Sequence, residues 1–169
     1  MVLILSGIAI PQTLATIDAS RTIGAARYLT SRLALTRSLA VQRTAAVAIR
    51  FETDSRGVFF STYRDGNHNG VRMRDIDLGI DRQIEQAVRL FEQFPGVDFG
   101  LVLDDASQDP IQIGNTSLLT FTPVGTATSG SLYVRGRDGS QYAVRVLGAT
   151  GRTRLQRYDA RQRKWTDEF

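Results

Sequence analysis

Cysteine is absent from the chain, and histidine occurs once, at His68. Without cysteine, neither a disulfide framework nor a thiolate metal site can form. A Ser-His-Asp or Cys-His constellation would have to use His68, which lies in a polar stretch typical of a solvated turn. No nucleophile-elbow or glycine-rich phosphate-loop motif occurs, and Asp104 and Asp105, being adjacent, would face opposite sides of a strand. We therefore expect a protein that is not an enzyme.

A long hydrophobic run is also lacking. The apolar stretch from Met1 to Ile10 ends at Pro11, and it supplies only about half of the roughly 20 residues that cross a bilayer. As printed, the stretch is too short to span a membrane, and its pattern alone would fit a buried N-terminal helix turn. The rest of the chain, with 42% hydrophobic residues in a total of 169, has enough apolar material for the core of one domain.

The pattern after Gly24 predicts one long helix. Neither glycine nor proline occurs between Gly24 and Arg50, and the run from Ala25 to Leu35 is rich in good helix formers. An apolar stripe at helical spacing runs along this segment. Its members are Ala26, Leu29, Leu33, Ala40 and Val47. We divide the chain into an N-terminal segment, 1–24, and a globular domain, 25–169, that contains a helix over 25–50.

The remainder predicts short strands separated by turns. Val47, Ile49 and Phe51 alternate with polar neighbours, and the turn at 54–57 leads into a second strand at 58–63. Further strands are expected at 118–121, 131–135, 141–147 and 153–158. Residues 64–82 are expected to form a loop, and the segment from Ile80 to Phe91 fits either a helix or an extended edge. A long helix followed by antiparallel strands gives an α+β fold class.

One loop carries a pattern that suits a cation. Residues 65–70 match the first half of the calcium-loop pattern D-x-[DN]-x-[DN]-G. Oxygen atoms at alternate positions can converge on one calcium ion, and the glycine allows the sharp turn. The twelfth position is Ile76, so a flanking aspartate would have to close the loop. The candidate ligands are Asp65, Asn67, Asn69, the carbonyl of Val71, Asp75 and Asp77. The alternative is turn chemistry without a metal.

Arginine is concentrated at the C-terminal end. Residues after Gly151 carry +3 of the net charge of +4. Arg152 and Arg154 are two residues apart, so on a strand they share a face, where two guanidinium groups could hold neighbouring phosphates. With Arg157 they are the candidate nucleic-acid-binding residues. The alternatives are a subunit interface or a strand end that is simply solvated.

Several pieces, in this order, resemble the GspH/FimT pseudopilins, which are type IV pilin-like proteins. They are the entry 5–11, the helix 26–40, the segment 121–134, which is expected to form a hairpin, and the closing segment 146–152. The resemblance covers nearly the whole chain and implies a long N-terminal helix packed on antiparallel sheets. Members of the family open with a basic leader and a Gly-Phe-Thr-Leu-X-Glu-like site, which are not present here, so we expect an in-frame extension upstream of Met1.

The resemblance implies a function as well as a fold. The first residues would be the second half of a membrane-spanning helix that anchors the subunit in the bacterial inner membrane and later forms the filament core. These residues are Val2, Leu3, Ile4, Leu5, Ile8, Ile10 and Pro11. The globular domain would lie in the periplasm. The expected partners are other pseudopilins, contacted through the N-terminal helix, and secretion-system components or the secreted protein.

Two functions from different classes remain open at this stage. The first is a structural role as a minor pseudopilin of a type II secretion system. The second is a FimT-like minor pilin that binds DNA for uptake, because the Gly151-Arg152-Thr153-Arg154 element is similar to one that such pilins use.

Overall fold

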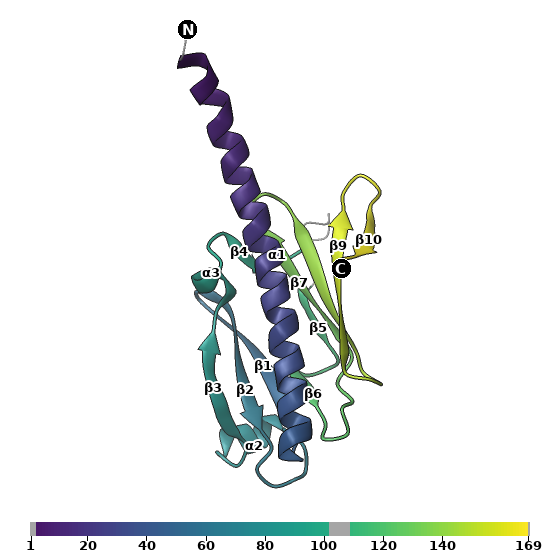
Figure 1. Ribbon diagram of the computed structural model, residues 1–169. Coiled ribbons are helices and arrows are strands. Elements are labelled where there is room, and N and C mark those ends of the chain that lie inside the picture. Colours follow the sequence, from purple (N-terminus) through teal and green to yellow (C-terminus); the bar gives the residue numbers. More distant parts are fainter. Residues whose placement is uncertain (1–2, 102–108, 169) are drawn as a thin grey trace.

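The computed structural model describes residues 3–101 and 109–168, with side chains described from residue 16 onward. A single long helix, α1 (Leu3–Arg43), lies along two antiparallel sheets, one on each side of it in Figure 1. Its N-terminal part extends beyond both sheets. The expected α+β fold with a long N-terminal helix is therefore confirmed.

Helix α1 ends at Arg43, seven residues before the expected end at Arg50. Thr44 adopts a left-handed conformation with φ of 49°, and the Ala45 N–H donates to the Ala40 carbonyl, which closes the helix with a Schellman-type cap. Val47 therefore belongs to a strand and not to the helical stripe. The alternation of β-branched residues after Thr44 outweighs the absence of glycine and proline, because it lets one face of a strand enter the core.

The first sheet has the strand order β3-β2-β1-β6. Its strands are β1 (Val47–Asp54), β2 (Gly57–Arg64), β3 (Arg82–Val88) and β6 (Leu118–Phe121). The expected β1–β2 hairpin is confirmed, with Asp54 paired to Gly57 at its turn. The loop between β2 and β3 contains a short helix, α2 (Met73–Asp77), and the ambiguous segment forms edge strand β3 followed by α3 (Leu90–Gln93).

The second sheet has the order β10-β9-β8-β7-β4, with β5 also paired to β7. Its strands are β4 (Val97–Phe99), β5 (Ile111–Ile113), β7 (Gly130–Gly136), β8 (Gln141–Leu147), β9 (Arg152–Asp159) and β10 (Lys164–Asp167). The strands expected near β7, β8 and β9 are confirmed, whereas β4, β5 and β10 were not anticipated.

The hairpin expected across 121–134 forms only in its first half, where Phe121 makes an antiparallel bridge with Ala127. β6 pairs with β1 in the first sheet, whereas β7 lies in the second, so this segment crosses between sheets. The Gly125 N–H donates to the Thr122 carbonyl, and Arg37 of α1 donates to the Gly125 carbonyl, so the crossing loop is held against the helix. The turn is also closed by the Thr122 N–H, which donates to the Thr126 carbonyl, and beyond Ala127 the chain leaves for the second sheet.

The core lies between α1 and the inner faces of both sheets. On α1 the buried apolar side chains are Ala25, Ala26, Leu29, Leu33 and Ala40. They pack with residues of both sheets, among them Ile49, Phe60, Leu119, Val134 and Val144. Arg32 of α1 is paired with Glu85 of β3, whose carboxylate also accepts the Thr62 hydroxyl at 2.6 Å. Apolar packing and this polar contact together fix α1 on the sheets.

Candidate functional site

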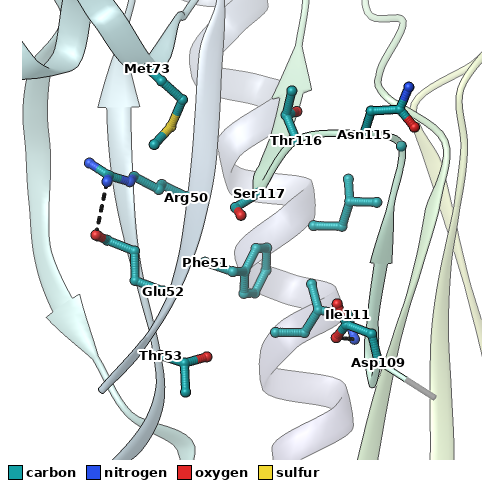
Figure 2. Close-up of a pocket in the computed structure, with 12 residues that line it drawn as sticks. Arg50, Phe51, Glu52, Thr53, Met73, Asp109, Ile111, Asn115, Thr116 and Ser117 are labelled. Carbon is teal, nitrogen blue, oxygen red and sulfur yellow. Dashed lines mark hydrogen bonds and ion pairs between the residues drawn. The ribbon is translucent and has the colours of Figure 1, made fainter. Parts of the chain in front are cut away.

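A crevice separates the second half of β1 from β5, and so lies between the two sheets (Figure 2). Its volume is about 520 Å³. It opens because β6 pairs only with residues 47–50 of β1, so the strand continues past the end of its neighbour. The lining residues are Arg50, Phe51, Glu52, Thr53, Met73, Asp109, Ile111, Ile113, Gly114, Asn115, Thr116 and Ser117.

The crevice combines an apolar floor with charged walls. Phe51 and Ile113 are buried core residues that reach it from opposite sheets. Arg50 pairs with Glu52 at 3.0 Å (Figure 2), and its Nε is buried without a hydrogen-bond partner. Such a surface can hold an apolar side chain and pair with polar groups of a protein partner. Sequence reasoning missed the crevice because its two walls are separated by about sixty residues of chain.

The loop after β2 is organised around three carboxylates. Asp65 accepts the backbone N–H groups of Asn67, His68 and Gly70 at 3.0, 2.7 and 2.7 Å. Asp81 accepts the N–H groups of Gly66 and Arg72 at 3.0 and 2.9 Å. Both oxygens of each carboxylate bind backbone donors: Asp65 closes its own turn by local turn chemistry, whereas Asp81 joins residues that are distant in the chain. His68 is an exposed turn residue with φ of 62°.

The other candidate calcium ligands are placed differently. Asp75 is buried and accepts the side-chain amides of Asn69 and Asn67 at 3.0 and 3.4 Å. Asp77 is 69% exposed and lies 4.0 Å from Arg50, and Val71 is buried beside α2. Within residues 3–101 and 109–168, no group of three or more histidine, cysteine, aspartate or glutamate side chains could hold a metal ion. Calcium binding stays a prediction, and Asp104 and Asp105 lie outside the described residues.

The candidate nucleic-acid-binding arginines all lie on β9 but on two faces. The register pairs Arg154 with Arg145 and Arg157 with Tyr142 of β8. Because faces alternate along a strand, Arg152 and Arg154 share the outer face with Arg145, and Arg157 points to the opposite face. Arg154 is 58% exposed and lies 3.9 Å from Asp167.

An aromatic group lies beside these arginines. The Trp165 ring lies 5.2 Å from that of Tyr158 and 5.5 Å from that of Tyr133. Trp165 also lines a small hollow of about 320 Å³ with Arg145 and Arg154. The outer face of the second sheet therefore places guanidinium groups next to an indole ring.

The candidate membrane and filament residues lie at the start of α1. Leu3, Ile4, Leu5, Ile8, Ile10 and Pro11 are all within this helix, which continues through Pro11, whereas Val2 lies outside the described residues. The described helices include none that is both long and apolar enough to cross a membrane. Further along α1, three large apolar side chains are exposed: Ile17, Leu35 and Val41.

Comparison with known proteins identifies two similarities. A family model described as "Type II transport protein GspH" matches residues 25–151. Among solved structures, the fold is similar to that of the minor pseudopilin EpsH from the type 2 secretion system of Vibrio cholerae. That match has a TM-score of 0.50 and 15% sequence identity, and it covers 80% of this chain and 95% of the other. No curated protein matches the sequence significantly.

Proposed function

Because the chain belongs to the GspH family of type II transport proteins, we propose that it is a minor pseudopilin, a structural subunit of a periplasmic filament in type II secretion. In this proposal the protein is not an enzyme. The start of α1 lies in the inner membrane before assembly and among the helices of other pseudopilins afterwards. The domain from β1 to β10 is presented on the periplasmic side.

The observation that carries this proposal is the uncovered part of α1. The helix begins at Leu3, but its first fully buried described side chain is Thr22. Before Thr22 the helix projects from the sheets, and Ile17 is exposed on this part. Leu35 and Val41 lie further along, where one side of α1 packs on the sheets, and they are exposed on its outer side. Exposed apolar side chains on a long helix suit packing against other helices. In a filament of pseudopilins, the N-terminal helices of the other subunits would be these packing partners.

Single cysteines test this assignment without background, because the chain has no cysteine of its own. Ile17→Cys and Leu35→Cys are introduced separately into the full chain, which is co-produced with cysteine-substituted pseudopilins of its own secretion system. Under oxidation, we expect disulfide-linked pairs from both α1 positions. Arg74→Cys on exposed α2 is the matched control and should give none. Absence of α1 cross-links in cells where the other subunits are present contradicts the proposal.

The crevice is the surface that we assign to a secretion-system component or to the secreted protein. Its apolar floor and its Arg50–Glu52 pair support this role, as does its place between the two sheets, with α1 running behind the lining residues in Figure 2. Ile111→Glu should reduce secretion while leaving filament cross-linking through α1 intact. The control Leu78→Glu changes an apolar residue that is 62% exposed outside the crevice. Equal secretion by both variants would remove this assignment.

DNA binding is the second candidate function. It is favoured by the common face of Arg145, Arg152 and Arg154 beside Trp165, since arginine and aromatic side chains together hold nucleic-acid strands. Replacing Arg152 and Arg154 with Gln should weaken DNA binding and reduce the slope of log K against log salt by up to about two units. Melting should change little, since exposed substitutions usually alter stability by about 0.5 kcal/mol or less. If the protein gives no gel shift with DNA at low salt, this candidate function is contradicted.

A further inference from the structure

A basic turn joins β9 to β10. Asp159 pairs with Lys164 at the end of the hairpin, and residues 160–163 form the connection. Arg161, Arg163 and Lys164 are all exposed, and we refer to these three as the basic turn. Arg163 has φ of 50°, the left-handed conformation that lets the chain reverse at this point.

The neighbouring carboxylates do not neutralise the basic turn. Asp159 accepts the backbone N–H groups of Arg161 and Gln162 at 2.9 and 3.2 Å, so it holds the turn in shape. Asp138, in the adjacent β7–β8 turn, accepts the N–H and hydroxyl of Ser140. Arg157 lines the same hollow as Asp138, Asp159 and Arg161, so four positive charges, with the basic turn, stand against two carboxylates and leave the hairpin tip positive.

The basic turn and the part of α1 before Thr22, which we call the free part of α1, project from the same end of the molecule (Figure 1). The contacts and the sheet register show which residue of α1 lies beside the start of the basic turn along the helix axis. Thr22 Oγ1 would lie 2.0 Å from a Cβ on Gly136, so helix and sheet are in contact there. The Gly136 N–H donates to the Ser140 carbonyl, and continuing the register of Tyr142 with Arg157 brings Ser140 level with Asp159. Thr22 and Asp159 therefore lie at about the same level.

From this common level, helix and turn extend in the same direction. Along α1, the distance from Thr22 to Pro11, where the apolar stretch ends, is about 16 Å at the helical rise per residue. Residues 160–163 form a turn that the hydrogen bonds of Asp159 hold together, so they add at most about 7 Å, the rise of two extended residues. The long arginine and lysine side chains add several ångströms. Because the headgroup layer extends about 5–7 Å outward from the hydrocarbon core, the charged groups can reach the headgroups of a bilayer that the apolar stretch enters.

We propose that the basic turn binds the anionic headgroups of the bilayer into which α1 leads. Within the described residues no ion pair involves the three cations of the basic turn, so lipid phosphates can supply the opposing charge, and the helix brings them within reach. The contact would set the orientation of the domain above the membrane before the subunit joins a filament. This inference rests on the proposed function, because it requires α1 to enter a membrane.

Vesicle flotation with the full chain tests the inference. Vesicles of phosphatidylcholine are compared with vesicles in which phosphatidylglycerol replaces a third of that lipid. Since each basic residue at an anionic surface contributes about five-fold in partitioning, we expect a preference on the order of a hundred-fold for the anionic vesicles. The variant Arg161→Gln, Arg163→Asn, Lys164→Gln should lose this preference. Asparagine is chosen at 163 because it tolerates the left-handed conformation.

The matched control removes the same charge from the far end of the molecule. Arg43, Arg74 and Arg82 are exposed, and they lie near the C-terminal end of α1, on α2 and at the start of β3, which Figure 1 places opposite the free part of α1. Replacing all three with Gln should change the preference by less than about two-fold, because charges beyond a Debye length of ~10 Å are screened. Circular dichroism melting checks that both triple variants stay folded. If the triple variant of the basic turn is unfolded, the single variant Arg161→Gln is used instead, and we expect it to lose about five-fold in the preference for anionic vesicles.

The outcomes separate this inference from the proposed function. Failure to float with either vesicle contradicts the membrane placement of α1 in the proposed function. Flotation that is equal with both vesicles contradicts only the role of the basic turn, as does an equal loss in the two triple variants. Retention by duplex DNA that depends on the basic turn, without any lipid preference, would assign the turn to nucleic acid and overturn the inference.

Discussion

At the scale of single residues, Asp54 connects the β1–β2 turn to the chain after β3. Its carboxylate accepts the Arg56 N–H at 2.8 Å and the Arg89 guanidinium at 3.0 Å. Arg89 also lies over the Phe59 ring, 4.8 Å from its centre, and donates to the Gly57 carbonyl. The hydrogen bond from Arg89 is the main reason that the pKa of Asp54 lies below its ordinary value.

Asp54→Asn should therefore lower stability in a pH-dependent way. A carboxylate whose folded pKa is depressed stabilises the fold above its unfolded pKa, and the stabilisation is lost as pH falls through the folded pKa. We expect the variant to melt at a lower temperature than the parent at neutral pH and at the same temperature in strong acid. Asp77→Asn, at an exposed position, is the control and should give parallel curves. A difference that persists unchanged in strong acid would contradict this explanation.

Calcium provides the second prediction at this scale. An ion that binds only the folded state raises stability by RT ln(1 + [L]/Kd), about 2.7 kcal/mol at a hundred-fold excess over Kd. Millimolar calcium should therefore raise the melting temperature, and Asp65→Ala should abolish the rise. Since Asp65 also binds three backbone N–H groups, Asp75→Ala is measured beside it. Identical melting in calcium and in chelator would leave turn chemistry as the whole role of the loop.

The turn-forming role of Asp65 could be predicted from the sequence, because its side chain accepts hydrogen bonds from backbone groups only two to five residues ahead. The contacts of Asp81 could not. Its side chain accepts the Gly66 N–H fifteen residues back in the chain, and sequence spacing shows no such partner. The same holds for Arg32 and Glu85, which meet only because the fold brings edge strand β3 within reach of the Arg32 side chain. Polar pairs of this kind depend on the tertiary fold.

At the scale of elements, strands with local partners were predictable and those with distant partners were not. The β1–β2 and β8–β9 pairs follow from alternation and a tight turn. β4 and β5 have three residues each and pair only with β7, so neither shows a pattern of its own. The expected 121–134 hairpin stops at the bridge between Phe121 and Ala127 for a related reason, because β6 pairs with β1, about seventy residues earlier.

Close approach of α1 to β7 gives a prediction at this scale. A Cβ on Gly136 would lie 2.0 Å from Thr22 Oγ1 and 2.4 Å from Asp138 Oδ1. Gly136→Ala should destabilise the protein by about 1–3 kcal/mol through overpacking, and Thr22→Ala should recover part of the loss by removing the hydroxyl. Urea denaturation of the two single variants and the double variant measures this coupling. Additive losses would show that helix and strand do not meet at Gly136.

At the scale of the whole molecule, the crevice and the basic turn are properties of the assembled sheets. Arg50 and Ile111 line the same crevice only because β1 continues past the end of β6 while β5 belongs to the opposite sheet. The basic turn lies at the same end of the molecule as the free part of α1 because β9 runs antiparallel to the helix. The sequence predicts the helix and most of the strands, but these surfaces require the order of strands in both sheets.

The last prediction concerns how much of α1 the domain needs. The buried apolar core residues of α1 begin at Ala25, Ile23 packs against them, and the first buried described side chain is Thr22. A chain that begins at Arg21 should therefore be a folded, soluble monomer with a melting temperature close to that of the full chain. A chain that begins at Thr30 loses Ala25, Ala26 and Leu29, and the buried leucine alone contributes about 1.5–3 kcal/mol.

We expect this shorter chain to melt at a much lower temperature or to be unfolded. Circular dichroism melting and sedimentation velocity of the two truncated chains make the comparison. Aggregation or unfolding of the longer one would mean that residues before Arg21 belong to the fold of the domain. They could not then be the part of α1 left free for a membrane or for neighbouring subunits, and both the filament role and the lipid contact of the basic turn would lose their structural basis.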